Sequence, residues 1–77
     1  MRVADRIREI IRKQTHCLPE DIKDHAKICD DLGADSLDFV EISIAIENAF
    51  KIQIPDKELN KIVTVGDWIK YVSTKVL

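Results

Sequence analysis

Residues 35–50 read DSLDFVEISIAIENAF and contain neither Gly nor Pro. Asp35 is a favourable helix N-cap, because its carboxylate can accept hydrogen bonds from the unpaired backbone N–H groups of the first turn. Gly33, two residues earlier, allows the chain to turn before the helix begins. The stretch therefore predicts a helix from residue 36 to residue 50.

This predicted helix carries apolar side chains on two opposite faces when successive residues are placed about 100° apart. We expect one face to meet the core: Phe39, Ile42, Ile46, Ala49 and Phe50. The other face carries Leu37, Val40 and Ile44. A small bundle cannot bury both faces of one helix within itself, so we expect the second face to meet solvent or a partner. The alternative is a helix that is buried all round.

The charge of the chain is concentrated around the same helix. The whole sequence has 12 basic and 14 acidic residues, a net charge of −2. Residues 30–50 carry −6 and the remainder +4, because residues 30–50 have no Lys or Arg. Their six carboxylates are Asp30, Asp31, Asp35, Asp38, Glu41 and Glu47. An apolar strip rimmed by carboxylates predicts docking to a basic, partly apolar protein surface and excludes a nucleic-acid recognition helix.

The rest of the chain predicts further helices and no strand. Residues 3–13 have an amphipathic pattern that ends near Thr15, and residues 55–61 predict a short helix. Thr64 begins a last helix through Val76, with a capping-box-like Thr64-x-x-Asp67 and Trp68 on its core face. Between the first two helices lies a long loop, residues 15–35, with a short turn at 19–22. We expect it to be ordered by four apolar side chains: Leu18, Ile22, Ile28 and Leu32.

The length of 77 residues indicates one domain, residues 1–77, which is all-α with three main helices and one short one. Such a chain has a thin core and little room for a deep catalytic cleft. No apolar run is long enough to enter a bilayer as a spanning helix, and the first residues do not resemble a signal peptide. We therefore predict a cytoplasmic protein in which Cys17 and Cys29 are reduced thiols.

Ser36 lies at the start of the central helix, where unpaired N–H groups and the helix dipole favour an anion. A phosphodiester on Ser36 would be well placed. A serine hydrolase is the competing hypothesis, with His16 or His25 as base, but the sequence lacks the Gly-x-Ser-x-Gly elbow. His16, Cys17, His25 and Cys29 could also bind zinc, although their spacing matches no common finger, and we predict no metal site.

The segment Asp30-Asp31-Leu32-Gly33-Ala34-Asp35-Ser36-Leu37-Asp38 resembles the phosphopantetheine attachment motif of acyl carrier proteins. The similarity covers most of the chain. It continues through Val40-Glu41, Ala45-Ile46-Glu47, Phe50, Ile52-x-Ile54-Pro55-Asp56 and Thr64-Val65-Gly66-Asp67.

The resemblance implies an acyl-carrier-like four-helix bundle that is not itself an enzyme. Ser36 would carry 4′-phosphopantetheine, transferred from coenzyme A by a holo-carrier synthase, and the thiol of that group would hold acyl chains as thioesters. Partners would be phosphopantetheinyl transferase and the acyltransferases and ketosynthases of fatty-acid or related lipid synthesis, acting on a monomer. The partner-binding residues would be Asp35, Leu37, Asp38, Val40, Glu41, Ile44 and Glu47.

Other features differ from the usual pattern of this family. The net charge of −2 is small for a carrier of fatty-acid synthesis, and Phe39 and Trp68 stand where such carriers usually have smaller residues. The alternatives are a carrier specialised for a very-long-chain lipid, polyketide or aminoacyl pathway, and a helical interaction module that is not modified.

Overall fold

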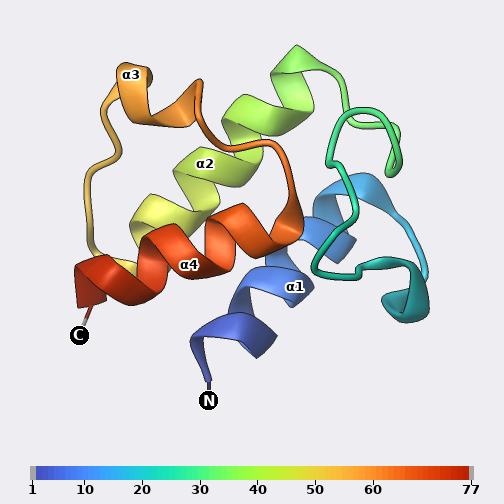
Figure 1. Cartoon of the computed structure of the whole chain (residues 1–77), viewed down its shortest axis with the longest axis horizontal. Helices are drawn as coiled ribbons and strands as arrows, with labels where there is room; N and C mark the ends of the chain where they lie inside the picture. Colours follow the sequence, from blue (N-terminus) through green and yellow to red (C-terminus); the bar gives the residue numbers. More distant parts are fainter. Residues whose placement is uncertain (1, 77) are drawn as a thin grey trace.

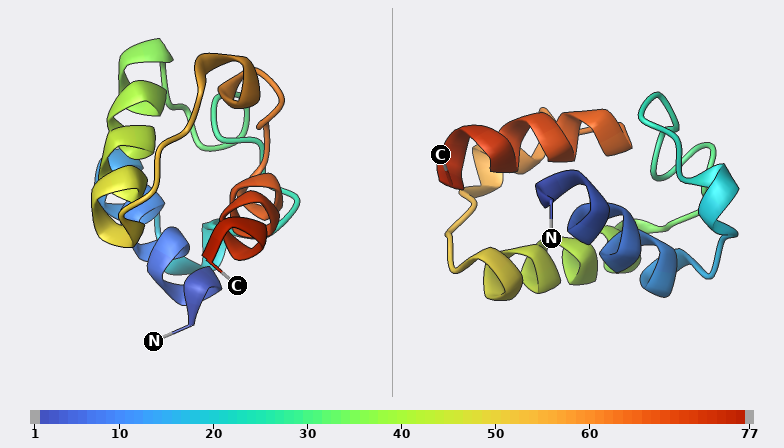
Figure 2. Two further views of the ribbon diagram at one scale, coloured as in Figure 1. Left: turned by 90° about the vertical axis from the view of Figure 1, so that its left-hand side faces the viewer. Right: turned by 90° about the horizontal axis from the view of Figure 1, so that it is seen from below.

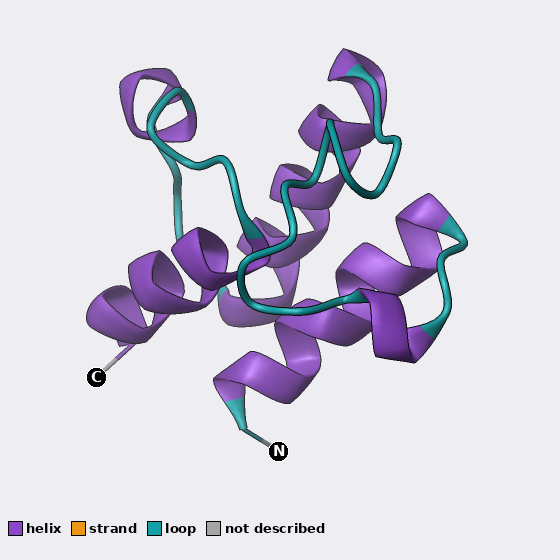
Figure 3. Ribbon diagram, turned by 45° about the vertical axis from the view of Figure 1, so that its right-hand side comes forward, coloured by secondary structure: helices purple, strands orange, loops and turns teal. Residues whose placement is uncertain are grey.

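The three amphipathic segments fold as helices close to the predicted boundaries in a computed structural model, which describes residues 2–76. They are α1 (Val3–Thr15), α2 (Ser36–Phe50) and α4 (Val65–Val76). The short helix α3 spans Asp56–Leu59, and a single 3₁₀ turn, η1, spans Pro19–Asp21. No strand occurs within residues 2–76, where the one β-bridge joins Lys27 to Thr64 (Figure 3). The predicted all-α fold with a long loop between its first two helices is confirmed.

The helices α1, α2 and α4 enclose one core, and α3 lies beside the gap between α2 and α4 (Figure 1). The helix α1 packs against both α2 and α4. The left view of Figure 2 shows α2 and α4 on opposite sides of the molecule with α3 at the top, and the right view shows α1 between α4 and α2. None of the helices within residues 2–76 is long and apolar enough to cross a membrane.

The core consists almost entirely of branched aliphatic side chains. Its fully buried members are Trp68, Ile7, Ile11, Ile28, Ile42, Ile46, Val65 and Val72. Two of the residues expected on the core face of α2, Ile42 and Ile46, are therefore confirmed. Phe39 and Phe50 also pack against the core, as expected, but they are only half-buried, and Ala49 is half-buried as well.

The long loop is held against the core, as expected, by Ile22, Ile28 and Leu32. The expectation for Leu18 is wrong, because its side chain is 59% exposed beside the start of η1. Backbone hydrogen bonds join the loop to the start of α4: Ile28 N donates to Val63 O (3.0 Å) and Val65 N to Ala26 O (3.0 Å). These bonds order a segment that has almost no regular secondary structure of its own.

Gly66 allows a further close contact between the loop and α4. Its N–H donates to the carbonyl oxygen of Asp24 at 2.7 Å, and a Cβ atom at this position would lie 2.9 Å from that oxygen. The carboxylate of Asp24 also pairs with Arg8 of α1. Asp24 thus attaches the loop to both α1 and α4. These contacts fix the position from which the chain leads into α2.

The predicted capping box at the start of α4 is present. Asp67 N donates to Thr64 Oγ1 (3.0 Å), and the Asp67 carboxylate accepts from the N–H groups of Thr64 (3.1 Å) and Val63 (3.0 Å). Because hydrogen bonds to a carboxylate favour its charged form, these two N–H groups hold the pKa of Asp67 below its ordinary value of 3.8.

We predict that Asp67→Asn destabilises the fold by about 1 kcal/mol at neutral pH, because its amide oxygen can still accept from Val63 N and Thr64 N but lacks the charge that strengthens these two hydrogen bonds. The carboxylate contributes its stabilisation above pH 3.8, its unfolded value, and loses it as the pH falls through the lower folded pKa. Urea unfolding at a series of pH values should therefore show the two proteins converging below about pH 3.8. Asp30→Asn, at an exposed loop residue whose carboxylate has no hydrogen bond or ion pair with residues 2–76, is the control and should match the wild type throughout.

Candidate functional site

Ser36 is the first residue of α2, and the residues around it are held by a reciprocal capping box. Asp38 N donates to Asp35 Oδ1 (2.8 Å), and Asp35 N donates to Asp38 Oδ2 (3.4 Å). The N-cap expected at Asp35 is confirmed. Gly33 has a positive φ of 76°, a conformation that glycine adopts without steric cost, and it turns the chain into this cap.

The Ser36 side chain is exposed, and its hydroxyl forms no hydrogen bond with any residue in the range 2–76. Neither His16 nor His25 bonds to it within that range, so the relay that a serine hydrolase requires is not assembled. A free hydroxyl at the first turn of a 15-residue helix is accessible to a modifying enzyme. The helix dipole at this end favours a negatively charged substituent.

A cavity of about 420 Å³ opens beside Ser36, between α2 and α3. Three of the residues that line it are polar: Ser36, Asp56 and Asn60. The rest of its wall is formed by Cys29, Phe39, Val40, Leu59 and Ile62. The Phe39 ring in this wall contacts Trp68 of α4, with ring centroids 5.8 Å apart and planes at 39°. The residues at this site can therefore accommodate a flexible, partly apolar group attached to Ser36.

The second apolar face of α2 is exposed, as expected. Leu37, Val40 and Ile44 are 66%, 46% and 49% exposed, so the alternative of a helix buried all round is wrong. The carboxylates of Asp35 and Glu41 are exposed on the same helix. We call these five residues, together with Asp38, the α2 face.

The helix α1 also contributes to the α2 face through Gln14, which the sequence analysis did not identify. Its side-chain amide donates to Glu41 Oε2 (2.8 Å) and lies 3.3 Å from Asp38 Oδ1. The amide fixes the orientation of two carboxylates without neutralising their charge. No local pattern could have revealed this contact, because the partners lie 24 and 27 residues apart.

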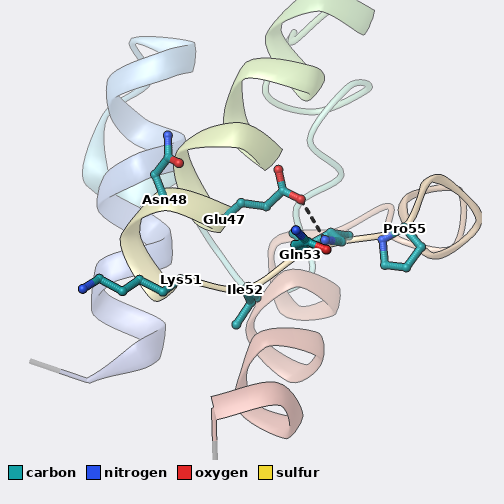
Figure 4. A pocket seen from close by; sticks show the side chains of 7 residues that line it. Glu47, Asn48, Lys51, Ile52, Gln53 and Pro55 are labelled. Atoms are coloured by element: carbon teal, nitrogen blue, oxygen red, sulfur yellow. Dashed lines mark hydrogen bonds between the residues drawn. The ribbon is translucent and has the colours of Figure 1, made fainter.

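The carboxylate of Glu47 bonds to the segment that follows α2. Glu47 Oε2 accepts a hydrogen bond of 2.8 Å from Ile54 N, and the residue is half-buried (Figure 4). It lines a second cavity, of about 740 Å³, at the turn between α2 and α3. Lys51 in this turn ends α2 in a left-handed conformation, with φ of 56°. Glu47 therefore stabilises the connection that leads to α3.

The four residues considered as zinc ligands have separate surroundings. His16 ends α1 in a left-handed conformation, and Cys17 Sγ donates to the carbonyl oxygen of Leu32 (3.5 Å). Cys29 lines the cavity beside Ser36, and His25 is exposed in the loop. Within residues 2–76 no group of three or more His, Cys, Asp or Glu side chains is arranged to hold a metal ion.

We predict that the capping role and the charge of Asp35 can be separated. Asp35→Asn retains an oxygen acceptor for Asp38 N and should change the free energy of unfolding by less than about 0.5 kcal/mol. Asp35→Ala removes the acceptor and should cost about 0.5–2 kcal/mol. Urea denaturation measures both values. Equal stabilities for the two variants would show that the cap contributes nothing.

Comparisons with known proteins agree with this geometry. The family model described as the phosphopantetheine attachment site matches residues 5–72. A protein named acyl carrier protein from Wolinella succinogenes is 47% identical over 74 residues, covering 96% of this chain and 97% of the relative. Acyl carrier proteins from Sulfurovum sp. strain NBC37-1 and Campylobacter fetus are 43% and 39% identical over 72 residues, covering 94% of this chain and 96% and 94% of theirs.

The matched region contains the capped start of α2, the free hydroxyl and the cavity beside it. Members of this family act as carriers of a covalently attached 4′-phosphopantetheine rather than as enzymes. The chain therefore belongs to the phosphopantetheine attachment family, among the acyl carrier proteins.

Proposed function

We propose that Ser36 is the attachment residue and that residues 1–77 form one carrier domain. The observation that carries the proposal is the position of Ser36: its exposed, unbonded hydroxyl lies at the capped N-terminus of α2 and borders an apolar cavity. In the transfer reaction Ser36 Oγ forms a bond to the phosphorus that carries the pantetheine, and the pyrophosphate P–O bond of coenzyme A breaks. Adenosine 3′,5′-bisphosphate leaves, and the serine proton passes to a base of the transferase.

The residues of the chain then have distinct tasks. The first turn of α2 faces the new phosphodiester with its unpaired N–H groups, which favour the negative charge. The apolar wall formed by Phe39, Leu59 and Ile62 is available to what the arm carries. The attached group supplies a thiol on which an acyl chain is held as a thioester. Chemistry on that chain occurs in the active sites of other enzymes.

We propose that the α2 face is the surface on which those enzymes dock. Leu37, Val40 and Ile44 supply exposed apolar area next to Ser36, and carboxylates surround them. A complementary surface combines an apolar patch with Arg or Lys side chains. Glu47, also predicted as a docking residue, contributes negative charge, although its Oε2 atom is bonded to Ile54 N.

We assign the carrier to fatty-acid or related lipid synthesis in the cytoplasm, as a monomer. Its partners are then a phosphopantetheinyl transferase and the acyltransferases and ketosynthases of that pathway. Curated relatives named acyl carrier protein, matched over nearly the whole chain, support this assignment.

The attachment proposal predicts a specific change in mass. Incubation with coenzyme A, Mg²⁺ and a broad-specificity phosphopantetheinyl transferase should increase the intact mass of the wild type by one phosphopantetheine group. Ser36→Ala should gain none, and Ser73→Ala, a half-buried serine of α4, should gain the same as the wild type. An unmodified wild type, or a modified Ser36→Ala, would refute the proposal.

The docking proposal predicts that Glu41→Lys and Ile44→Arg lower the kcat/KM of the transferase about tenfold, or about 1.4 kcal/mol. Their melting temperatures should hardly change, because both side chains are exposed. The loss in Glu41→Lys should shrink as salt is added, since it is chiefly electrostatic.

Two variants away from the α2 face serve as controls. Glu20→Lys makes the same charge change at an exposed residue of η1, and Val63→Arg replaces an apolar residue that is 49% exposed, as Ile44 is. Both controls should be modified at the wild-type rate. Losses equal to those of the α2-face variants would show that net charge, and not this surface, governs docking.

A further inference from the structure

We infer that Phe39 limits the length of the acyl group that this carrier can shelter. The inference rests on the proposed attachment at Ser36. A short acyl group fits the cavity beside that residue, whereas the distal part of a long chain stays outside the bundle. Phe39 is thus a specificity-determining residue for the cargo.

The walls of the cavity support this inference. Ser36 and Phe39 line the same cavity of about 420 Å³, so a group attached to the serine has direct access to the ring. The same ring contacts Trp68, with centroids 5.8 Å apart, and Trp68 is completely buried. The aromatic pair therefore stands between the cavity and the interior that α2 and α4 enclose.

Buried side chains of the core occupy the interior behind the pair. Trp68 is completely buried, as are its neighbours on the core face of α4, Val65 and Val72. Protein interiors are close-packed, so an intruding chain needs a side chain to leave. Trp68 is held on all sides, whereas Phe39 is only half-buried. The ring of Phe39 is consequently the group whose removal would open the interior.

The hydrophobic effect converts this geometry into a length limit. Each methylene that enters the cavity leaves water, which stabilises the loaded protein. Once the cavity is filled, further methylenes stay in contact with water and add no stability. The melting temperature should therefore rise with acyl length at first and then become constant.

The experiment uses the full chain loaded at Ser36 from acyl-coenzyme A thioesters by a phosphopantetheinyl transferase. The series comprises acetyl, butanoyl, octanoyl, dodecanoyl and hexadecanoyl groups, and intact mass confirms each product. Circular dichroism gives the melting temperature relative to the holo form of the same protein. In the wild type we expect that dodecanoyl and hexadecanoyl raise it no further than octanoyl does.

Phe39→Ala should remove the limit, so that its melting temperature rises further from octanoyl to dodecanoyl, by about 4 °C or more. Phe50→Ala is the matched control, because Phe50 is the other half-buried phenylalanine of α2 and does not line the cavity. This variant should keep the wild-type plateau. Phe39→Leu is a milder variant for use if Phe39→Ala does not fold. Its melting temperature should also rise from octanoyl to dodecanoyl, by a smaller amount.

The possible results separate the inference from the proposed function. Two results overturn the length limit. One is a wild type whose melting temperature rises progressively up to hexadecanoyl. The other is a Phe50→Ala variant whose melting temperature rises from octanoyl to dodecanoyl as much as that of Phe39→Ala does. Loading without a limit leaves attachment at Ser36 intact. A wild type that gains no mass overturns the attachment and, with it, the length limit.

Discussion

The structure depends on a constraint of size: α2 has apolar side chains on two faces, and a 77-residue chain can cover only one of them. The face with Ile42 and Ile46 is taken up by the core, where α1 and α4 surround it. The face with Leu37, Val40 and Ile44 then has no internal partner. A helix that is too apolar for its own domain is suited to a protein that works by repeated contact with others.

The position of Ser36 beside the exposed face of α2 depends on the long loop that precedes it. The proposed attachment at Ser36 requires a fixed position relative to the α2 face, yet a long segment with little regular structure precedes this residue. Backbone hydrogen bonds to Val63 and Val65 and the close contact at Gly66 hold this segment to α4. The Asp35–Asp38 capping box then fixes the last step into the helix. The ordered loop thus fixes the position of Ser36, whose side chain stays exposed.

Much of this arrangement could be predicted because it is encoded locally. Helical periodicity indicated α1, α2 and α4, and the caps at Asp35 and Thr64 follow from side-chain chemistry within one turn. Contacts between distant segments could not be predicted. The bonds of Gln14 to the carboxylates of α2 depend on how α1 crosses α2, and no pattern in either helix specifies that crossing.

Phe39 faces the core, as helical periodicity predicted, but periodicity could not predict that it is only half-buried. A helical wheel assigns a direction to each side chain but not the depth of protein above it. The Phe39 ring contacts Trp68, and it also lines the cavity that α3 borders. A ring in this position contacts the core on one side and the cavity beside Ser36 on the other. The incomplete cover that leaves Phe39 half-buried also leaves its ring in the wall of that cavity. The size of the Phe39 side chain therefore affects both the cover of the core and the room beside Ser36. A smaller side chain would enlarge the cavity, but it would also remove apolar contacts from a core that is already thin.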